Sequence, residues 1–206
     1  GDRAALAARL TLGLANHSLR RGEHDQALEH LREALPHAER AGDRVLTGRI
    51  VNNIGIALLD SGMPEEALAE FRRALELRRG LGYRTGEVIN LHNIGDTYLR
   101  MGDQARAFAS FEQSRDLAKE CAWERGVVMN APYLAFLRGL RGEDVAAELA
   151  SVAEAAVRIG EQDSALTARW FAARLTENTE EVSRIRAEAE AAGFTNLALL
   201  IGAGEQ

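Results

Sequence analysis

The sequence predicts an all-α protein made of repeated pairs of helices. Four glycines recur at 40-residue intervals, with similar residues around each: Gly22, Gly62, Gly102 and Gly142. Apolar residues follow the spacing of one helix face, as Val51, Ile54 and Leu58 do at i, i+3 and i+7. No segment alternates apolar and polar residues in the way that is typical of strands. Together these observations predict an elongated array of helix-turn-helix units.

The 40-residue copies align apolar residues in columns. One column holds Leu14, Ile54, Ile94 and Leu134, and another holds Ala27, Ala67, Ala107 and Ala147. Small residues such as Gly55 let the two helices of a unit approach closely, and we expect Phe71 to fill the seam between them. Because one helix pair buries too little apolar surface to offset its lost conformational entropy, several copies must stack.

The turns between the helices are marked by residue types that end or begin helices. The recurring glycines can adopt the left-handed conformation that ends the first helix of each unit, and Gly42 and Gly82 can do the same between units. Asp43 and Asp103 are placed to cap the following helices. Pro64 suits a first helical turn, where its missing N–H costs nothing.

These units resemble a known repeat. The Ile-Gly pairs at Ile54 and Ile94, together with the small-x-x-Ala turns, resemble the tetratricopeptide repeat in its longer form near 40 residues, as in kinesin light chains and bacterial regulators. The resemblance covers Arg3 to Ile159 and is strongest in "VNNIGIALLDSGMPEEALAEFRRALELRRGLG". It implies a right-handed α-solenoid of four to five repeats, in which the first helix of each unit lines a concave groove.

The repeat pattern weakens after Ile159. Gly160 resembles an inter-unit turn that comes two residues early, and "SALTARWFAARL" predicts the first helix of a fifth unit. We expect a helix from about Glu180 to Ala192 and a short last helix in "FTNLALLIG". Residues 160–206 then form a degenerate repeat and a cap that covers the last seam, so that residues 1–206 make a single domain. The alternative is a tail that packs on a neighbouring molecule.

Composition restricts the classes of function. The net charge of −6 argues against binding to a phosphate backbone, which needs clustered Lys and Arg. One cysteine, Cys121, cannot form an internal disulfide, which favours a reducing cytoplasm. No apolar run reaches the length of a membrane span and no leader opens the chain. Because residue 1 is Gly, we expect a piece of a larger protein.

The sequence gives little indication of catalysis. No P-loop, HExxH, GxSxG, CxxC or GxGxxG pattern occurs. His30 and His37 lie two helical turns apart, about 10 Å by helix rise, so they cannot share a zinc ion bound at roughly 2 Å per ligand. We interpret these two residues and His24 as solvated side chains, and we expect no enzyme activity, no cofactor and no metal site.

The candidate binding surface is the face of the first helices that points away from the buried stripe. In the first copy it comprises Arg9, Leu12, Gly13, Asn16 and Arg20. In the second copy it comprises Arg49, Asn52, Asn53, Ile56 and Asp60, and in the third copy it comprises Ile89, His92, Asn93, Asp96 and Arg100. The fourth copy contributes Met129, Pro132, Tyr133, Phe136 and Leu140.

Asn53 and Asn93 are the central candidates. Each stands just before an Ile-Gly pair, where the resemblance implies an asparagine that grips the backbone of a bound peptide. A carboxamide can do this because it offers both a donor and an acceptor. Gly13 and Tyr133 interrupt the column in the first and fourth copies. The alternative is that both asparagines bond a neighbouring helix.

Two other groups of residues have both a binding and a structural interpretation. Asp60 and Arg100 share a column with opposite charges, so they can simply pair between units. Met129, Tyr133, Phe136 and Leu140 form an anchoring pocket if exposed, or ordinary core if the C-terminal helices cover them. Pro132 lies in the same predicted helix and favours a kink.

The predicted function is a cytoplasmic module that binds a protein or an extended peptide. The resemblance implies a recruitment or regulatory segment of a larger bacterial signalling or transcription-regulating protein. One alternative is a small-molecule effector sensor with an enclosed cavity near Phe136 and Trp170. Another is self-association into a homo-oligomer through an exposed terminal seam.

Overall fold

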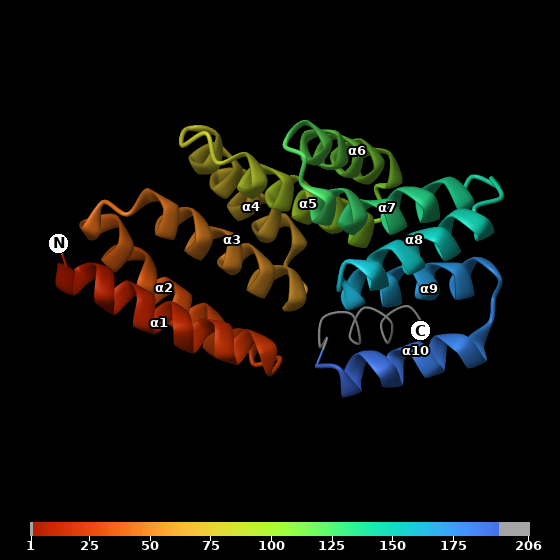
Figure 1. The fold of residues 1–206 in the computed structure, drawn as a ribbon. Coiled ribbons are helices and arrows are strands. Elements are labelled where there is room, and N and C mark those ends of the chain that lie inside the picture. The colour runs from red at the N-terminus through yellow and green to blue at the C-terminus, as the bar shows by residue number, and fades with distance from the viewer. Residues whose placement is uncertain (1, 194–206) are drawn as a thin grey trace. The chain divides into compact units, whose positions relative to one another are not determined.

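The computed structural model describes residues 2–193, and these residues form ten α-helices and no strand (Figure 1). The helices are α1 (Asp2–Arg20), α2 (His24–Ala41), α3 (Arg44–Asp60), α4 (Pro64–Arg79), α5 (Arg84–Arg100), α6 (Gln104–Glu120), α7 (Glu124–Gly139), α8 (Ala146–Arg158), α9 (Gln162–Leu175) and α10 (Thr179–Ala191). The chain divides into two compact units, Gly1–Ser110 and Phe111–Gln206.

In the first unit, consecutive helices pack as pairs, and the pairs stack. Helix α1 packs on α2 and α3 packs on α4, while α2 also contacts α3 and α4 contacts α5 (Figure 1). The first helices of successive pairs are neighbours too, because α1 contacts α3 and α3 contacts α5. The predicted helix-turn-helix repeats are therefore confirmed here, and one face of α1, α3 and α5 forms a continuous surface.

The seam inside the α3–α4 pair is as tight as its small residues predict. Phe71 of α4 is fully buried, and a Cβ added to Gly55 of α3 would lie 2.6 Å from the Phe71 ring. Ala67 is also fully buried at this seam. Glycine at position 55 is thus required by the close approach of α3 and α4, and Phe71 fills the space that it leaves.

The turn predictions are confirmed in both the glycines and the caps. Gly22, Gly62, Gly102 and Gly142 have φ values of 72°, 77°, 78° and 88°. Asp43 accepts a hydrogen bond from the Leu46 amide at 3.0 Å, and Asp103 accepts one from the Arg106 amide at 2.9 Å. Helix α4 begins at Pro64 as expected. The helix ends are therefore set by local residue type.

The second unit continues the same pairing with a less regular sequence. Helix α9 packs on α7 and α8, and α10 packs on α9. This confirms a fifth first helix followed by one more helix, as the sequence predicts. The short helix expected in residues 194–202 lies outside the described residues. The turns at Ala122 and Glu177 have a φ of 52° without glycine, which the sequence pattern did not predict.

Two of the aligned columns predict the wrong burial for one residue each. Leu14 is 55% exposed although Ile54, Ile94 and Leu134 are buried, because no described helix packs on that face of α1. Ala147 is exposed, whereas its column mates are fully buried. Helix α8 begins four residues after Gly142, but α2, α4 and α6 begin two residues after their glycines. Leu149 is consequently buried in place of Ala147.

Candidate functional site

The candidate residues of the second and third copies lie on the surface shared by α3 and α5. Arg49 is exposed, and the following residues are partly buried: Asn53, Ile56, His92, Asn93 and Asp96. Asn52 was expected to face outward but is only 5% exposed, and Leu12 of α1 is likewise buried. The Asn52 side chain points to α5, where its carboxamide accepts hydrogen bonds.

A ladder of asparagine carboxamides joins α1, α3 and α5. Asn53 donates from Nδ2 to Asn16 Oδ1 at 2.8 Å, and it accepts from Asn52 Nδ2 at 3.3 Å. Asn52 Oδ1 in turn accepts from Asn90 Nδ2 and Asn93 Nδ2, both at 3.0 Å. Asn53 and Asn93 therefore do bond neighbouring helices. For both residues, this was the alternative to peptide binding that the sequence left open.

The ladder leaves hydrogen-bonding capacity on the two central candidates. A carboxamide has two N–H donors and two acceptor lone pairs. The ladder uses one Nδ2 proton of Asn93, and one Nδ2 proton and one lone pair of Asn53. Both residues are partly exposed, unlike the fully buried Asn90. The same carboxamides can thus hold the helices together and still offer groups to a ligand.

A charged cluster lies beyond the ladder, at the carboxyl ends of α3 and α5. Arg100 donates to Asp60 Oδ1 and to Asp96 Oδ2, both at 3.1 Å, which confirms the predicted pairing of Asp60 with Arg100. The Asp60 side chain is only 4% exposed. Burial raises the pKa of the Asp60 carboxyl above its ordinary value, and the charge of Arg100 opposes that rise. The Asp60 carboxyl therefore keeps its proton up to a higher pH than an ordinary aspartate does, despite the ion pair.

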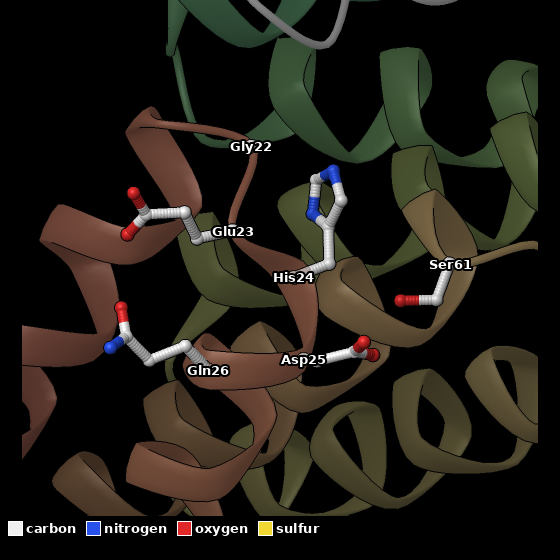
Figure 2. Close-up of a pocket in the computed structure, with 6 residues that line it drawn as sticks. All are labelled: Gly22, Glu23, His24, Asp25, Gln26 and Ser61. Carbon is white, nitrogen blue, oxygen red and sulfur yellow. The ribbon is translucent and has the colours of Figure 1, made fainter.

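A hollow of about 620 Å³ opens beside this cluster (Figure 2). It is lined by Gly22, Glu23, His24, Asp25, Gln26 and Ser61. Asp60 directly precedes Ser61, and the charge of His24 acts on the Asp60 carboxyl. His24 begins α2 and Ser61 directly follows α3, so neither lies on the face of the first helices from which the sequence candidates were taken.

The candidates of the fourth copy lie in an aromatic core of the second unit. Phe136 is 5% exposed and stacks on Phe171 of α9 with ring centroids 4.2 Å apart. Tyr133 stacks on Phe111 at 4.6 Å and meets Phe171 edge-on at 5.2 Å, while Met129 is partly buried. Trp170 also stacks on Phe171, at 4.9 Å. Phe136 is therefore core rather than a groove residue.

Within residues 2–193, no group of three or more His, Cys, Asp or Glu side chains is arranged to hold a metal ion. Over the same residues, no helix combines the length and the apolar character that crossing a bilayer requires.

The two prolines inside helices do not end them. Helix α7 continues through Pro132, and α2 continues through Pro36.

Solved structures of other proteins have the same fold as this chain. A Rap protein complexed with competence and sporulation factor matches with a TM-score of 0.73 and 16% identity, over 98% of this chain and 63% of that one. A signal transduction ATPase with a tetratricopeptide repeat sensor, from Pyrococcus horikoshii, matches with a TM-score of 0.68 and 18% identity, over 96% and 32%. A putative kinesin light chain from Podosopora anserina matches with a TM-score of 0.61 and 16% identity, over 90% and 97%. The chain thus spans less than two thirds of the first two proteins, and the predicted α-solenoid fold is confirmed.

The sequence itself matches a family model. No curated protein matches the chain. The model described as tetratricopeptide repeat matches residues 6–80 and 50–120, which together span more than half of the chain. With the repeated helix pairs, the left-handed glycine turns and the tight Gly55 seam already described, this match shows that the chain belongs to the tetratricopeptide repeat family.

Proposed function

We propose that the chain binds an extended peptide along the shared face of α1, α3 and α5, with Asn53 and Asn93 gripping the peptide backbone. The observation that carries this proposal is the asparagine ladder, which fixes both carboxamides while leaving them partly exposed. A carboxamide held in place by its neighbours loses little side-chain entropy on binding. It can also pair with backbone N–H and C=O groups whatever the side chains of the peptide are.

The structural neighbours support a regulatory setting for this binding. One of them is a Rap protein in complex with a competence and sporulation factor, and another carries a tetratricopeptide repeat sensor on a signal transduction ATPase. We propose that this chain is the recruitment or regulatory segment of a larger bacterial signalling or transcription-regulating protein in the cytoplasm. In this role it acts as a binding module rather than as an enzyme, and residues 1–206 form one repeat domain.

Alanine substitution of the two asparagines tests the main proposal. We expect Asn53→Ala with Asn93→Ala to weaken the capture of peptides from a displayed random library by tenfold or more, a loss of about 1.4 kcal/mol. This is the size expected for one or two lost hydrogen bonds. The measurement is the affinity of selected peptides for the variant and for the original chain.

Asn90→Ala is the matched control for this experiment. It breaks a bond of the same ladder, to Asn52, but Asn90 is fully buried and cannot touch a ligand. We expect it to lower stability while leaving peptide capture intact. Equal capture by the double variant and the original chain would rule out gripping by these asparagines.

A second candidate function is self-association, and one observation favours it. Leu6, Leu10 and Leu14 follow one face of α1 and are 59%, 63% and 55% exposed. The residues 40 positions later, Leu46, Ile50 and Ile54, are buried in α3, which packs on α2. Light scattering over a wide range of concentrations tests this function, since a chain that stays monomeric throughout does not self-associate.

A further inference from the structure

An apolar groove of about 530 Å³ lies in the second unit, where α9 packs on both α8 and α10 (Figure 1). Its most buried lining residues are Ala165 and Leu166 of α9, which are 6% and 8% exposed. Ala153 and Val157 of α8 and Ala192 beside α10 also line it. The other lining residues are polar: Glu154, Gln162, Arg169 and Glu188. The groove thus presents apolar side chains to water, which favours an apolar occupant.

The equivalent place in the first unit is closed by charged side chains. A hollow of about 470 Å³ is lined there by residues of α2, α3 and α4, and Arg73 of α4 donates to Glu39 of α2 at 3.1 Å. Glu39 stands three residues before Gly42, and Val157 stands three residues before Gly160. Both glycines have a positive φ at the turn between two repeats. Because Val157 cannot form the ion pair, the groove of the second unit is left apolar.

The basic residue of this lining is already paired. Arg169 donates to Glu188 at 2.6 Å and to Glu181 at 2.7 Å, so two carboxylates of α10 satisfy its guanidinium. A guanidinium that is held by two carboxylates has little attraction left for a further anion. The shape and the apolar character of the groove therefore select its occupant more than charge does.

The chain itself supplies an apolar segment at the edge of this groove. Ala192 lines the groove, Gly193 follows with a φ of 76°, and residues 194–206 continue from there. Glu205 is the only ionisable side chain of this segment in the sequence. Four of its apolar residues have the spacing of one helix face: Phe194, Leu197, Ala198 and Ile201. The segment thus has the pattern of a helix that buries one apolar face.

The expected helix and the groove match in length. A helix over residues 194–201 is about 12 Å long, at 1.5 Å per residue. The lining residues of α9 cover an equal stretch with the same i, i+3, i+4, i+7 spacing: Gln162, Ala165, Leu166 and Arg169. Because the segment is attached beside the groove, its effective concentration there is on the order of 1 mM. In dilute solution it therefore meets its own groove before it meets that of a second copy.

We propose that residues 194–201 form a helix that docks in the groove between α8 and α10, with its apolar face against Ala165 and Leu166. The occupant is a segment of the same chain, and it closes the apolar opening that the last repeat lacks the charges to close. This inference goes beyond the proposed peptide binding and does not depend on it, because the peptide face of α1, α3 and α5 belongs to the first unit.

Nuclear Overhauser effects between methyl groups test the docking in the full chain. We expect cross-peaks from the methyl groups of Leu197 and Ile201 to those of Ala165 and Leu166, which report direct contact. In a mixture of isotope-labelled and unlabelled chains, cross-peaks between copies should be absent, because the segment docks on its own chain. Cross-peaks between copies, or no cross-peak from the segment to the groove, would overturn the proposal.

Substitutions within the segment test which of its faces docks. We expect Leu197→Asp to speed the amide hydrogen exchange of residues 194–201 by about tenfold or more, because a carboxylate does not enter the apolar groove and the segment is released. Leu199→Asp is the matched control, since it adds the same charge on the opposite face of the expected helix. It should leave the exchange rates unchanged. Equal effects of the two variants, or no effect of either, would contradict docking through this face.

A charge in the groove wall tests the other side of the contact. Ala153 is partly buried on α8, and we expect Ala153→Glu to release the segment with the same acceleration of exchange. Ser151→Glu adds the same charge to an exposed residue of α8 that does not line the groove, and it should change nothing. Circular dichroism shows whether both variants keep their helices. Slow exchange that persists in folded Ala153→Glu would mean that the segment docks elsewhere, and would refute the proposal.

Discussion

At the scale of single residues, Asp60 shows how the charged cluster affects stability. Burial raises the pKa of its carboxyl and Asp96 adds to the rise, while Arg100 and His24 oppose it. The folded chain therefore binds this proton more tightly than the unfolded chain does. Because stability falls with rising pH wherever the folded state holds more protons, ionisation of Asp60 weakens the fold.

Asp60→Asn tests this conclusion. We expect the variant to have a higher Tm than the original chain at neutral pH, because the buried charge is gone. The advantage shrinks as the pH falls through the raised pKa of Asp60, where the original carboxyl also becomes neutral. In a chain of this size, each 1 kcal/mol of stability changes Tm by roughly 2–4 °C. Thermal melts followed by circular dichroism between neutral and acid pH measure the difference.

Asp103→Asn is a control with the opposite sign. Hydrogen bonds from the Arg106 backbone and side chain lower the pKa of Asp103, so its ionised form stabilises the fold. That contribution is present above the ordinary pKa and is lost as the pH falls through the lowered one. We expect this variant to melt lower than the original chain at neutral pH and equally at low pH. Shifts of the same sign in both variants would contradict the assignment.

At the scale of helices, substitution of Gly55 tests the packing of α3 on α4 most directly. A methyl group at this position would lie 2.6 Å from the Phe71 ring, so α3 and α4 must move apart. We expect Gly55→Ala to destabilise the chain by about 1–3 kcal/mol, as overpacked cores do. Gly13→Ala is the matched control, because nothing lies within 4 Å of its added Cβ. It should stabilise α1 by up to about 1 kcal/mol through helix propensity.

Urea unfolding of both glycine variants gives the two free energies directly. Opposite signs for Gly55 and Gly13 support close approach as the reason for glycine at position 55. A neutral Gly55→Ala would mean that α3 and α4 are not held together by this seam, and that the repeated Ile-Gly pair has another cause.

Helix type and turn position were predictable from the sequence because they depend on local residues. Glycine at Gly62, a cap at Asp43 and proline at Pro64 each act within one helical turn, and each was found as expected. The register of α8 was not predictable from the spacing of Gly142. Its first turn is set by packing, which buries Val145 and Leu149, and no local residue marks the two-residue shift.

The candidate site was predictable only where it follows the repeat. Asn53 and Asn93 stand in one column, which made them visible in the sequence. Their partners Asn16 and Asn52 lie 37 and 41 residues away from them, so the ladder does not follow the 40-residue spacing. The packing of Phe136 on Phe171 was equally hidden, because it joins two helices outside the regular pattern.

At the scale of the whole molecule, the exposed leucines of α1 are the surface on which the proposed self-association can be tested. Three large apolar side chains along one helix face cost free energy in water, and pairing with a second copy removes them from it. Leu10 is at the centre of the stripe and is the most exposed of the three. We expect Leu10→Glu to keep the chain monomeric at concentrations where the original chain self-associates, as measured by light scattering. Val157→Glu places the same charge on α8, at a residue 65% exposed, and should leave association unchanged. If both variants associate like the original chain, the α1 stripe is not the contact between copies.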